Sequence, residues 1–239
     1  MDSGQQITEH PLQHLDYFME WGGKGWQHLM TYAFEHFIGR DLRGQHVLEI
    51  GTRYGKMACL FALLGAKVVG LDLNRKSLAI AYEEAAKLKV SDMTLFVREV
   101  GDLSTVNADS LDVVFSKSVL VMVPDLVRFL EEVKAKLKPG GKIVFLENAK
   151  GPWWVHLLRT FRHGKWDHKK ARYFTSNEIR LISEVFDGFV VRSWAFPPVV
   201  LMMGHKPKAD NLHAVQSHIG EVCLAHSVPA QNSPLPLSR

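Results

Sequence analysis

The chain has 239 residues, 46% of them hydrophobic, so it can bury one substantial core and we expect a single globular domain. Its 29 basic residues outnumber 25 acidic ones only slightly and are spread along most of the chain, a pattern that does not indicate a nucleic-acid-binding protein. Two widely separated cysteines, Cys59 and Cys223, indicate neither a disulfide framework nor a cysteine-rich metal site.

The first predicted element is a helix that precedes the core. Residues 21–38 repeat apolar and aromatic side chains at helical spacing, which predicts an amphipathic helix. Strands and helices then alternate along the chain. The predicted strands are 46–50, 67–73, 93–97, 111–116 and 142–146, and the predicted helices between them are 56–64, 75–88 and 124–137. This alternation predicts an α/β fold, a parallel sheet with helices on both faces.

The rhythm changes after Asn148. An aromatic and basic stretch is followed by a predicted helix over 176–186, with Thr175 or Ser176 as its N-cap. Two β-rich runs, 189–196 and 199–205, flank a pair of prolines and predict an antiparallel pair at the end of the sheet.

The pattern divides the chain into three parts. We expect an N-terminal helical lid over 1–40, the main domain over 41–205, and a flexible polar tail over 206–239. No basic segment followed by an apolar run opens the sequence, and no apolar stretch reaches membrane-spanning length. We therefore expect a soluble, cytoplasmic protein without a membrane span.

The loop after the first predicted strand indicates a ligand site. It reads Glu49-Ile50-Gly51-Thr52-Arg53-Tyr54-Gly55, in which Gly51 and Gly55 allow a sharp turn and a close backbone approach. Glycines in such a turn can also serve geometry alone. However, Asp72 ends the second strand, where a carboxylate can accept hydrogen bonds from two ribose hydroxyls. Together these features predict a nucleoside-bearing cofactor.

Five segments, taken in order, resemble the motifs of class I S-adenosylmethionine-dependent methyltransferases. They are VLEIGTRYG, GLDLN, the pair Gly101-Asp102, LDVVFSKSVL and LKPGGKIVFLEN. The resemblance covers about residues 43–148 and extends more weakly to 205. It implies a Rossmann-like, doubly wound, mostly parallel seven-stranded sheet with an antiparallel C-terminal hairpin. It also implies S-adenosyl-L-methionine as the cofactor and methyl transfer to an oxygen or nitrogen of a small-molecule acceptor.

The resemblance also implies which residues hold the cofactor. Glu49 would lie near the methionine amino group, the loop would surround the methionine, and Asp72 would bind the ribose. The remaining positions concern the adenine and the sulfonium. The residues implied to bind the cofactor are Glu49, Gly51, Thr52, Arg53, Gly55, Asp72, Leu73, Asp102, Leu103 and Ser116.

Two of these positions need comment. Arg53 replaces the usual middle glycine of the loop, so it is either an anchor of the loop or a group that faces the acceptor, and we favour the anchor. Ser116, with Lys117 beside it, would border the sulfonium and the acceptor. Leu73 would pack on the adenine, whose edge would be read at Asp102 and Leu103.

Methyl transfer from a sulfonium needs alignment and exclusion of water more than side-chain chemistry. A general base would assist transfer to a hydroxyl acceptor, and His163 and His168 are the main candidates; His156, Glu147 and Tyr173 lie in the same part of the chain. The aromatic residues could cover an apolar acceptor, although core packing is the favoured interpretation. These residues are Tyr17, Phe18, Trp21, Trp26, Trp153 and Trp154. The histidine spacing predicts no metal site.

Three other functions stay open. A nicotinamide dehydrogenase shares the glycine turn but would need a third glycine and a second nucleotide-binding half. A catalytically inactive methyltransferase-like scaffold is compatible with Arg53. An RNA or protein methyltransferase could use the basic residues 159–172, but the position after the fourth strand reads Ser116-Lys117-Ser118-Val119 and lacks the amino-methylation signature. Nucleic acid is therefore not the expected partner, and no oligomeric state is inferred.

Overall fold

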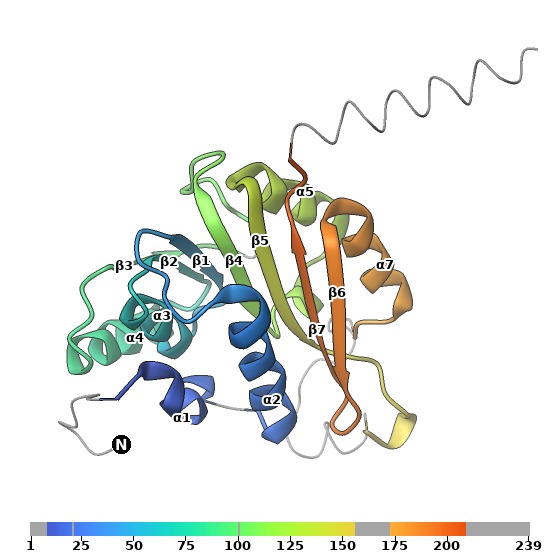
Figure 1. The fold of residues 1–239 in the computed structure, drawn as a ribbon, viewed down its shortest axis with the longest axis horizontal. Helices are drawn as coiled ribbons and strands as arrows, with labels where there is room; N and C mark the ends of the chain where they lie inside the picture. The colour runs from blue at the N-terminus through green and yellow to red at the C-terminus, as the bar shows by residue number, and fades with distance from the viewer. Residues whose placement is uncertain (1–8, 21, 100, 156–172, 209–239) are drawn as a thin grey trace, which may run out of the picture. The chain divides into compact units, whose positions relative to one another are not determined.

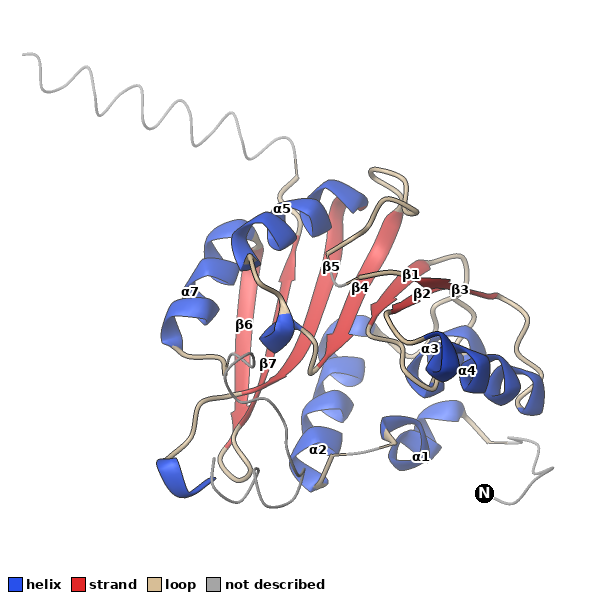
Figure 2. Ribbon diagram, turned by 180° about the vertical axis from the view of Figure 1, so that it is seen from behind, coloured by secondary structure: helices blue, strands red, loops and turns tan. Residues whose placement is uncertain are grey.

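The computed structural model describes residues 9–20, 22–99, 101–155 and 173–208. Residues Met1–Lys206 form one compact unit, separate from a second unit, Pro207–Arg239. The first unit is built on one seven-stranded sheet with helices packed on both faces (Figures 1 and 2).

The strands occur largely where the hydrophobic pattern predicts them. They are β1 (His46–Ile50), β2 (Lys67–Asp72), β3 (Met93–Val97), β4 (Leu111–Lys117), β5 (Leu137–Asn148), β6 (Asp187–Trp194) and β7 (Val199–His205). Their order in the sheet is β3-β2-β1-β4-β5-β7-β6. The first five strands pair in parallel, and β7 pairs antiparallel with both β5 and β6. The predicted fold class is confirmed, including the antiparallel pair at one end.

The helices surround this sheet. The α-helices are α1 (Leu15–Met19), α2 (Lys24–Ala33), α3 (Lys56–Leu63), α4 (Arg75–Lys87), α5 (Leu126–Lys136) and α7 (Ser176–Val185). The short turns are η1 (Pro11–His14), η2 (Phe34–Ile38), which continues α2 as a π-helix, and η3 (Leu120–Met122). In the part of the chain that is described, none of the helices is long and apolar enough to cross a membrane.

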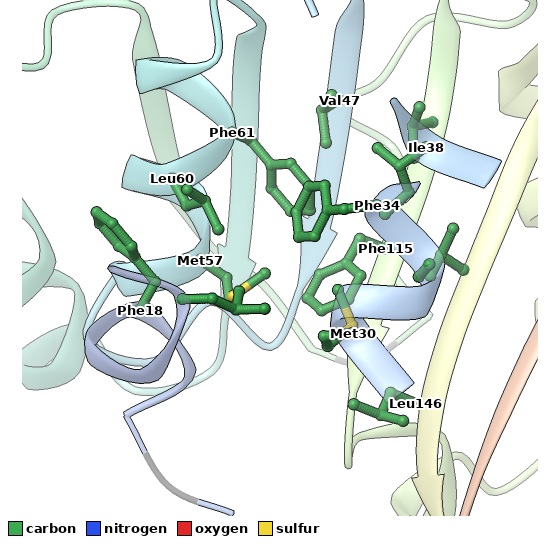
Figure 3. Packing of buried hydrophobic residues seen from close by; sticks show 14 of the residues in the cluster. Phe18, Met30, Phe34, Ile38, Val47, Met57, Leu60, Phe61, Phe115 and Leu146 are labelled. Atoms are coloured by element: carbon green, nitrogen blue, oxygen red, sulfur yellow. The ribbon is translucent and has the colours of Figure 1, made fainter. Parts of the chain in front are cut away.

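Each face of the sheet has its own apolar core. One core joins α1, α2 and α3 to alternate residues of the strands, so that Phe61 packs between Phe34 and Phe115 (Figure 3). The core on the opposite face joins α5 and α7 to the sheet through residues such as Phe129 and Ile182. Helices α1 and α2 are therefore part of the folded core.

Side-chain caps define several helix starts. The side chain of Asn74 accepts hydrogen bonds from the backbone at the start of α4, and Asp125 does the same for α5. Thr175 caps α7 in a capping box with Glu178, which confirms the first of the two predicted N-caps. These caps show that the local sequence specifies where the helices begin.

The main differences from the prediction are at β5 and α1. Strand β5 begins at Leu137, whereas the apolar run predicted a start at Lys142 and a helix continuing to Leu137. Pairing with β4 shifts register between Leu111 and Val113, and Gly140 turns with a φ of 76°. The lysine, proline and glycines of this segment do not form a strand-like sequence pattern. Its strand conformation is evident only from its pairing with the neighbouring strands. Helix α1, which the sequence analysis did not predict, is too short to show helical periodicity.

Candidate functional site

The loop from Gly51 to Gly55 connects β1 to α3 at the edge of the sheet where the parallel strands end. Both glycines adopt positive φ angles, 79° and 76°. A Cβ atom on Gly51 would overlap the side chain of Val119, and one on Gly55 would lie 2.6 Å from the Cβ of Ala81. The backbone amides of Gly51 and Thr52 donate to the carbonyl of Leu71 at 2.8 and 3.0 Å. The glycines are thus required by packing, and the loop approaches the neighbouring strands closely.

Asp72, at the tip of β2, holds the same loop. Its Oδ2 accepts a hydrogen bond from the amide of Arg53 at 2.8 Å, and its Oδ1 accepts one from the amide of Asn74 at 2.8 Å. Each carboxylate oxygen can accept more than one hydrogen bond, so Asp72 can still bind ribose hydroxyls. The structure therefore places the two main features of the predicted cofactor site in direct contact.

Arg53 connects the loop to the N-terminal segment. Its backbone has a φ of 51°, the left-handed conformation that a middle glycine would adopt readily. Its guanidinium lies 3.6 Å from the carboxylate of Glu20, which follows α1, and 4.7 Å from the centre of the Tyr54 ring. These contacts fit the favoured interpretation of Arg53 as an anchor of the loop.

Thr52 also has a structural contact of its own. It is buried, and its hydroxyl donates to the carbonyl of Glu49 at 3.3 Å. The side chain lies against Gly70 of β2, where an added Cβ would come within 2.5 Å of the hydroxyl. Thr52 would therefore contribute to a ligand site through its backbone position in the turn more than through its side chain.

Glu49 and Lys117 bring buried charge to the site. Glu49 is only 4% exposed, and burial raises the pKa of its carboxyl well above the usual value, while the charge of Lys117 lowers it. Burial lowers the pKa of Lys117 to about 8, and the charges of Glu20 and Glu49 raise it. The amine of Lys117 donates to the carbonyl of Met19 at the end of α1. The tips of β1 and β4 thus face the N-terminal segment.

The loop after β4 is held by β5. The Oε1 of Glu147 accepts hydrogen bonds from the amides of Val119 and Leu120, both at 2.9 Å, and the Glu147 side chain is fully buried. Beside it, the side-chain amide of Asn148 donates to the hydroxyl of Ser118 at 2.7 Å. Glu147 therefore supports the loop, a role that differs from the general base considered for it.

The side chain of Ser116 lies in the interior, on the face of the sheet opposite to that of Glu49 and Lys117. It pairs in register with Ile50, is fully buried, and its hydroxyl lacks a hydrogen-bond partner among the described residues. Its position directly beside the glycine loop is the one implied for a residue near the sulfonium.

The residues implied for the adenine lie on the β2 and β3 side of the site. Leu73 follows Asp72 directly and is 64% exposed, so an apolar side chain is available to a flat ligand. Asp102 accepts a hydrogen bond from the amide of Ser104 at 3.1 Å, and its carboxylate lies 3.4 Å from Arg98. Leu103 is buried in the core, which leaves only its backbone for recognition of the adenine edge.

The acceptor side is described only in part. His163 and His168, with His156, lie outside the described residues. The aromatic residues divide into two groups: Phe18 and Trp26 are buried in the core, whereas Trp153 is 75% exposed and Trp154 43% exposed. Trp154 lies 5.5 Å from Phe196 of the β6–β7 turn, measured between ring centres. Core packing is therefore correct for the N-terminal pair.

Two contacts of the site were not predicted from the sequence: Glu20 lies beside Arg53 of the glycine loop, and the carbonyl of Met19 accepts from Lys117. Their segment is anchored elsewhere as well, because the Tyr17 hydroxyl donates to Glu84 of α4 and the amine of Lys56 lies 3.8 Å from the centre of the Tyr17 ring. No local motif marks these contacts. Among the described residues, no group of three His, Cys, Asp or Glu side chains could hold a metal ion.

The segment that contains this site is similar to known methyltransferases. A family described as "Methyltransferase domain" matches residues 48–145. A ubiquinone biosynthesis O-methyltransferase of Neisseria meningitidis is 33% identical over 120 residues, 49% of this chain and 50% of the relative. The corresponding protein of Vibrio parahaemolyticus is 30% identical over 149 residues, 59% of this chain and 62% of the relative. The chain thus matches less than two thirds of the length of these relatives.

Solved structures show the same fold. A phosphoethanolamine N-methyltransferase of Haemonchus contortus, solved with S-adenosylhomocysteine, superposes with a TM-score of 0.64 at 17% identity, covering 87% of this chain and 61% of that one. A SAM-dependent methyltransferase of Methanosarcina mazei superposes with a TM-score of 0.57 at 21% identity, covering 75% of this chain and 97% of that one. At these identities, the likeness concerns the fold.

Proposed function

We propose that this chain is a class I, Rossmann-like S-adenosylmethionine-dependent methyltransferase that transfers a methyl group to a small-molecule acceptor, because residues 48–145 match a methyltransferase domain. One observation carries the proposal. The loop bracketed by Gly51 and Gly55 at the tip of β1 is bound directly by the carboxylate of Asp72 at the tip of β2. This is the edge of an open α/β sheet at which nucleotide ligands bind.

The residues present fit S-adenosyl-L-methionine. The Oε2 of the buried Glu49 has no hydrogen-bond partner among the described residues, so it is available to an ammonium group. Asp72 retains acceptor capacity for ribose hydroxyls, and the exposed Leu73 would cover the adenine. When bound, the cofactor supplies an electrophilic methyl group on a sulfonium. Gly51, Thr52, Gly55, Asp102, Leu103 and Ser116 complete the proposed cofactor site, with Arg53 as its anchor.

The chain's own residues would orient the reaction. The loop after β4 borders the transfer site, and Glu147 fixes its backbone through two amides. Alignment of the acceptor with the methyl group and exclusion of water account for most of the catalysis that such a site needs.

The acceptor is proposed to be a hydroxyl compound. The relatives named O-methyltransferases favour oxygen over nitrogen as the acceptor atom. For a hydroxyl acceptor, His163 and His168 stay the proposed general bases, one of which would take the hydroxyl proton. A cytoplasmic location likewise stays a prediction.

Calorimetry with S-adenosylhomocysteine tests the proposal. We expect the purified chain to bind this product with a micromolar dissociation constant and not to bind NAD. Absence of S-adenosylhomocysteine binding at high micromolar concentration would refute the proposed function, and binding of NAD would restore the dehydrogenase alternative.

An activity assay distinguishes an enzyme from an inactive scaffold. The chain, incubated with S-adenosylmethionine and a mixture of hydroxylated metabolites, should produce compounds heavier by one methylene unit, detected by mass spectrometry. A chain that binds the cofactor but methylates no compound in the mixture, and no RNA or protein added in its place, would favour the scaffold.

A further inference from the structure

Three large aromatic side chains are exposed near the turn between β6 and β7. Trp153 is 75% exposed, Trp154 is 43% exposed and Phe196 is 56% exposed. The rings of Trp154 and Phe196 lie 5.5 Å apart between their centres, and Trp153 is next to Trp154 in the chain. We call these three residues the aromatic surface. Single exposed apolar side chains are common in proteins, but several gathered at one place usually mark a site of interaction.

Contacts with folded elements fix the position of the aromatic surface. The indole nitrogen of Trp194, at the end of β6, donates to the carbonyl of Phe196 at 2.8 Å. A Cβ atom on Gly25 of α2 would overlap the Trp194 ring, and one on Gly151 would lie 2.7 Å from the ring of Pro198. Figures 1 and 2 show the start of α2 and the β6–β7 turn at the same end of the sheet. The rings are therefore held on the folded unit.

The charged residues around the aromatic surface are basic. Three stretches of the chain meet at this end of the sheet, namely residues 22–28, 148–155 and 192–198. Their sequences contain Lys24, Lys150 and Arg192 and no aspartate or glutamate. All three basic side chains are exposed. A partner that covers the rings would therefore meet positive charge beside them.

A basic stretch of the sequence also begins and ends at this side of the molecule. Residues 156–172, which lie outside the described residues, contain six lysines and arginines and one aspartate. They follow the buried Val155 directly, and soon after them the carbonyl of Phe174 accepts from the amide of Lys150 at 2.9 Å. The charge of this stretch has the same sign as that of the described basic residues.

We propose that the aromatic surface binds the protein to the surface of an anionic lipid bilayer. Tryptophan suits the boundary between lipid headgroups and acyl chains, because its ring is apolar while its indole N–H can bond to water or headgroups. Lysine and arginine side chains beside the rings would be attracted by the negative headgroups. The inference goes beyond the proposed methyl transfer and does not depend on it.

Two other occupants fit the observations less well. A second copy of the chain would bring the same positive charge to the aromatic surface, and like charges oppose association. A single strand of RNA is normally bound along a positively charged groove in which successive bases stack on rings. The aromatic surface is a compact group at a turn and a short segment after β5, which suits a flat partner better than a strand.

Co-sedimentation with lipid vesicles tests the role of charge. We expect the full chain to bind vesicles made of equal parts phosphatidylglycerol and phosphatidylcholine, and to bind pure phosphatidylcholine at least about 10-fold more weakly. Raising the salt concentration from about 0.1 M to about 1 M should weaken binding to the anionic vesicles, because the Debye length falls from about 10 Å to about 3 Å. No binding to the anionic vesicles, or equal binding to both kinds, would overturn the proposal.

The double variant Trp153→Ser/Phe196→Ser tests the role of the rings. Its binding to the anionic vesicles should fall at least about 10-fold, because two large apolar side chains no longer leave water. Urea unfolding should show that the variant is folded, since both side chains are exposed. Ile80→Ser/Val127→Ser is the matched control, because it removes exposed apolar side chains from α4 and α5 and should bind as the wild type does. An equal loss in this control would overturn the proposal.

The same variants distinguish the other occupants. If an oligouridylate bound the wild type in preference to the anionic vesicles, and Trp153→Ser/Phe196→Ser abolished that binding, the aromatic surface would be assigned to nucleic acid and the proposal overturned. A dimer that binds no vesicles, and that this variant dissociates in sedimentation without lipid, would overturn it in favour of a second copy. The variant should bind S-adenosylhomocysteine as the wild type does, so failure of cofactor binding and failure of vesicle binding are separate results.

Discussion

Replacement of Glu147 by glutamine should remove a pH dependence of folding. The Glu147 side chain is fully buried at the end of β5, and its Oε1 accepts hydrogen bonds from the amides of Val119 and Leu120. Burial raises the pKa of this carboxyl from 4.5 to about 8, and the hydrogen bonds from Leu120 and Val119 oppose that rise. A glutamine has the same shape, keeps an oxygen for both amides, and does not ionise.

The magnitude follows from the difference between the folded and unfolded states. Below pH 4.5 the carboxyl is protonated in both states, and the stability associated with it is fully present. As the pH rises toward 8, the unfolded chain releases this proton while the folded chain retains it, so unfolding becomes easier by about 1.4 kcal/mol per pH unit. We expect the wild type to lose roughly 5 kcal/mol relative to Glu147→Gln across this range.

Urea unfolding measures this difference. The free energies of unfolding of the wild type and Glu147→Gln should be similar at about pH 4 and should diverge as the pH rises toward about 8, above which the difference becomes constant. Glu131→Gln is the matched control, because Glu131 is an exposed residue of α5 whose carboxylate lies 3.9 Å from the amine of Lys134. If the wild type and Glu147→Gln depend equally on pH, Glu147 is ionised in the folded protein and the reasoning from burial is wrong.

Three further predictions concern the loop and a helix cap. Asp72→Ala should weaken binding of S-adenosylhomocysteine by about 1–3 kcal/mol in calorimetry, and an unchanged dissociation constant would disprove the ribose assignment. Gly51→Ala should destabilise the protein in urea by more than the roughly 1 kcal/mol expected for a left-handed alanine, because the new Cβ overlaps Val119. Gly44 also has a φ of 76° but has open space around it, so Gly44→Ala measures the backbone contribution alone. Equal destabilisation by Gly51→Ala and Gly44→Ala would contradict the packing argument. Thr175→Ala should cost about 0.5–2 kcal/mol of unfolding free energy, and a smaller loss would mean that the capping box contributes little.

Local patterns in the sequence were sufficient for most of the fold. Strands β3 and β7 have the bounds that their apolar runs predict, and Thr175 caps α7. Such features depend on residues a few positions apart, since strand and helix periodicities and caps are local properties. The tips of β1 and β2 were likewise predictable as neighbours, because consecutive parallel strands usually lie side by side and end at one edge.

Contacts between distant residues depended on the tertiary structure. The amine of Lys117 donates to the carbonyl of Met19, which is 98 positions away in the sequence. Glu20 pairs with Arg53 because it follows α1, a helix that no periodic pattern in the sequence predicted. The start of β5 at Leu137 also became evident only from its pairing with β4. A sequence pattern indicates which face of a helix or strand is apolar. Which charged side chains lie together at the ends of these elements depends on how the elements pack. The glycine loop and Asp72 could therefore be identified from the sequence, whereas the contacts of Glu20 with Arg53 and of Lys117 with Met19 required the folded chain.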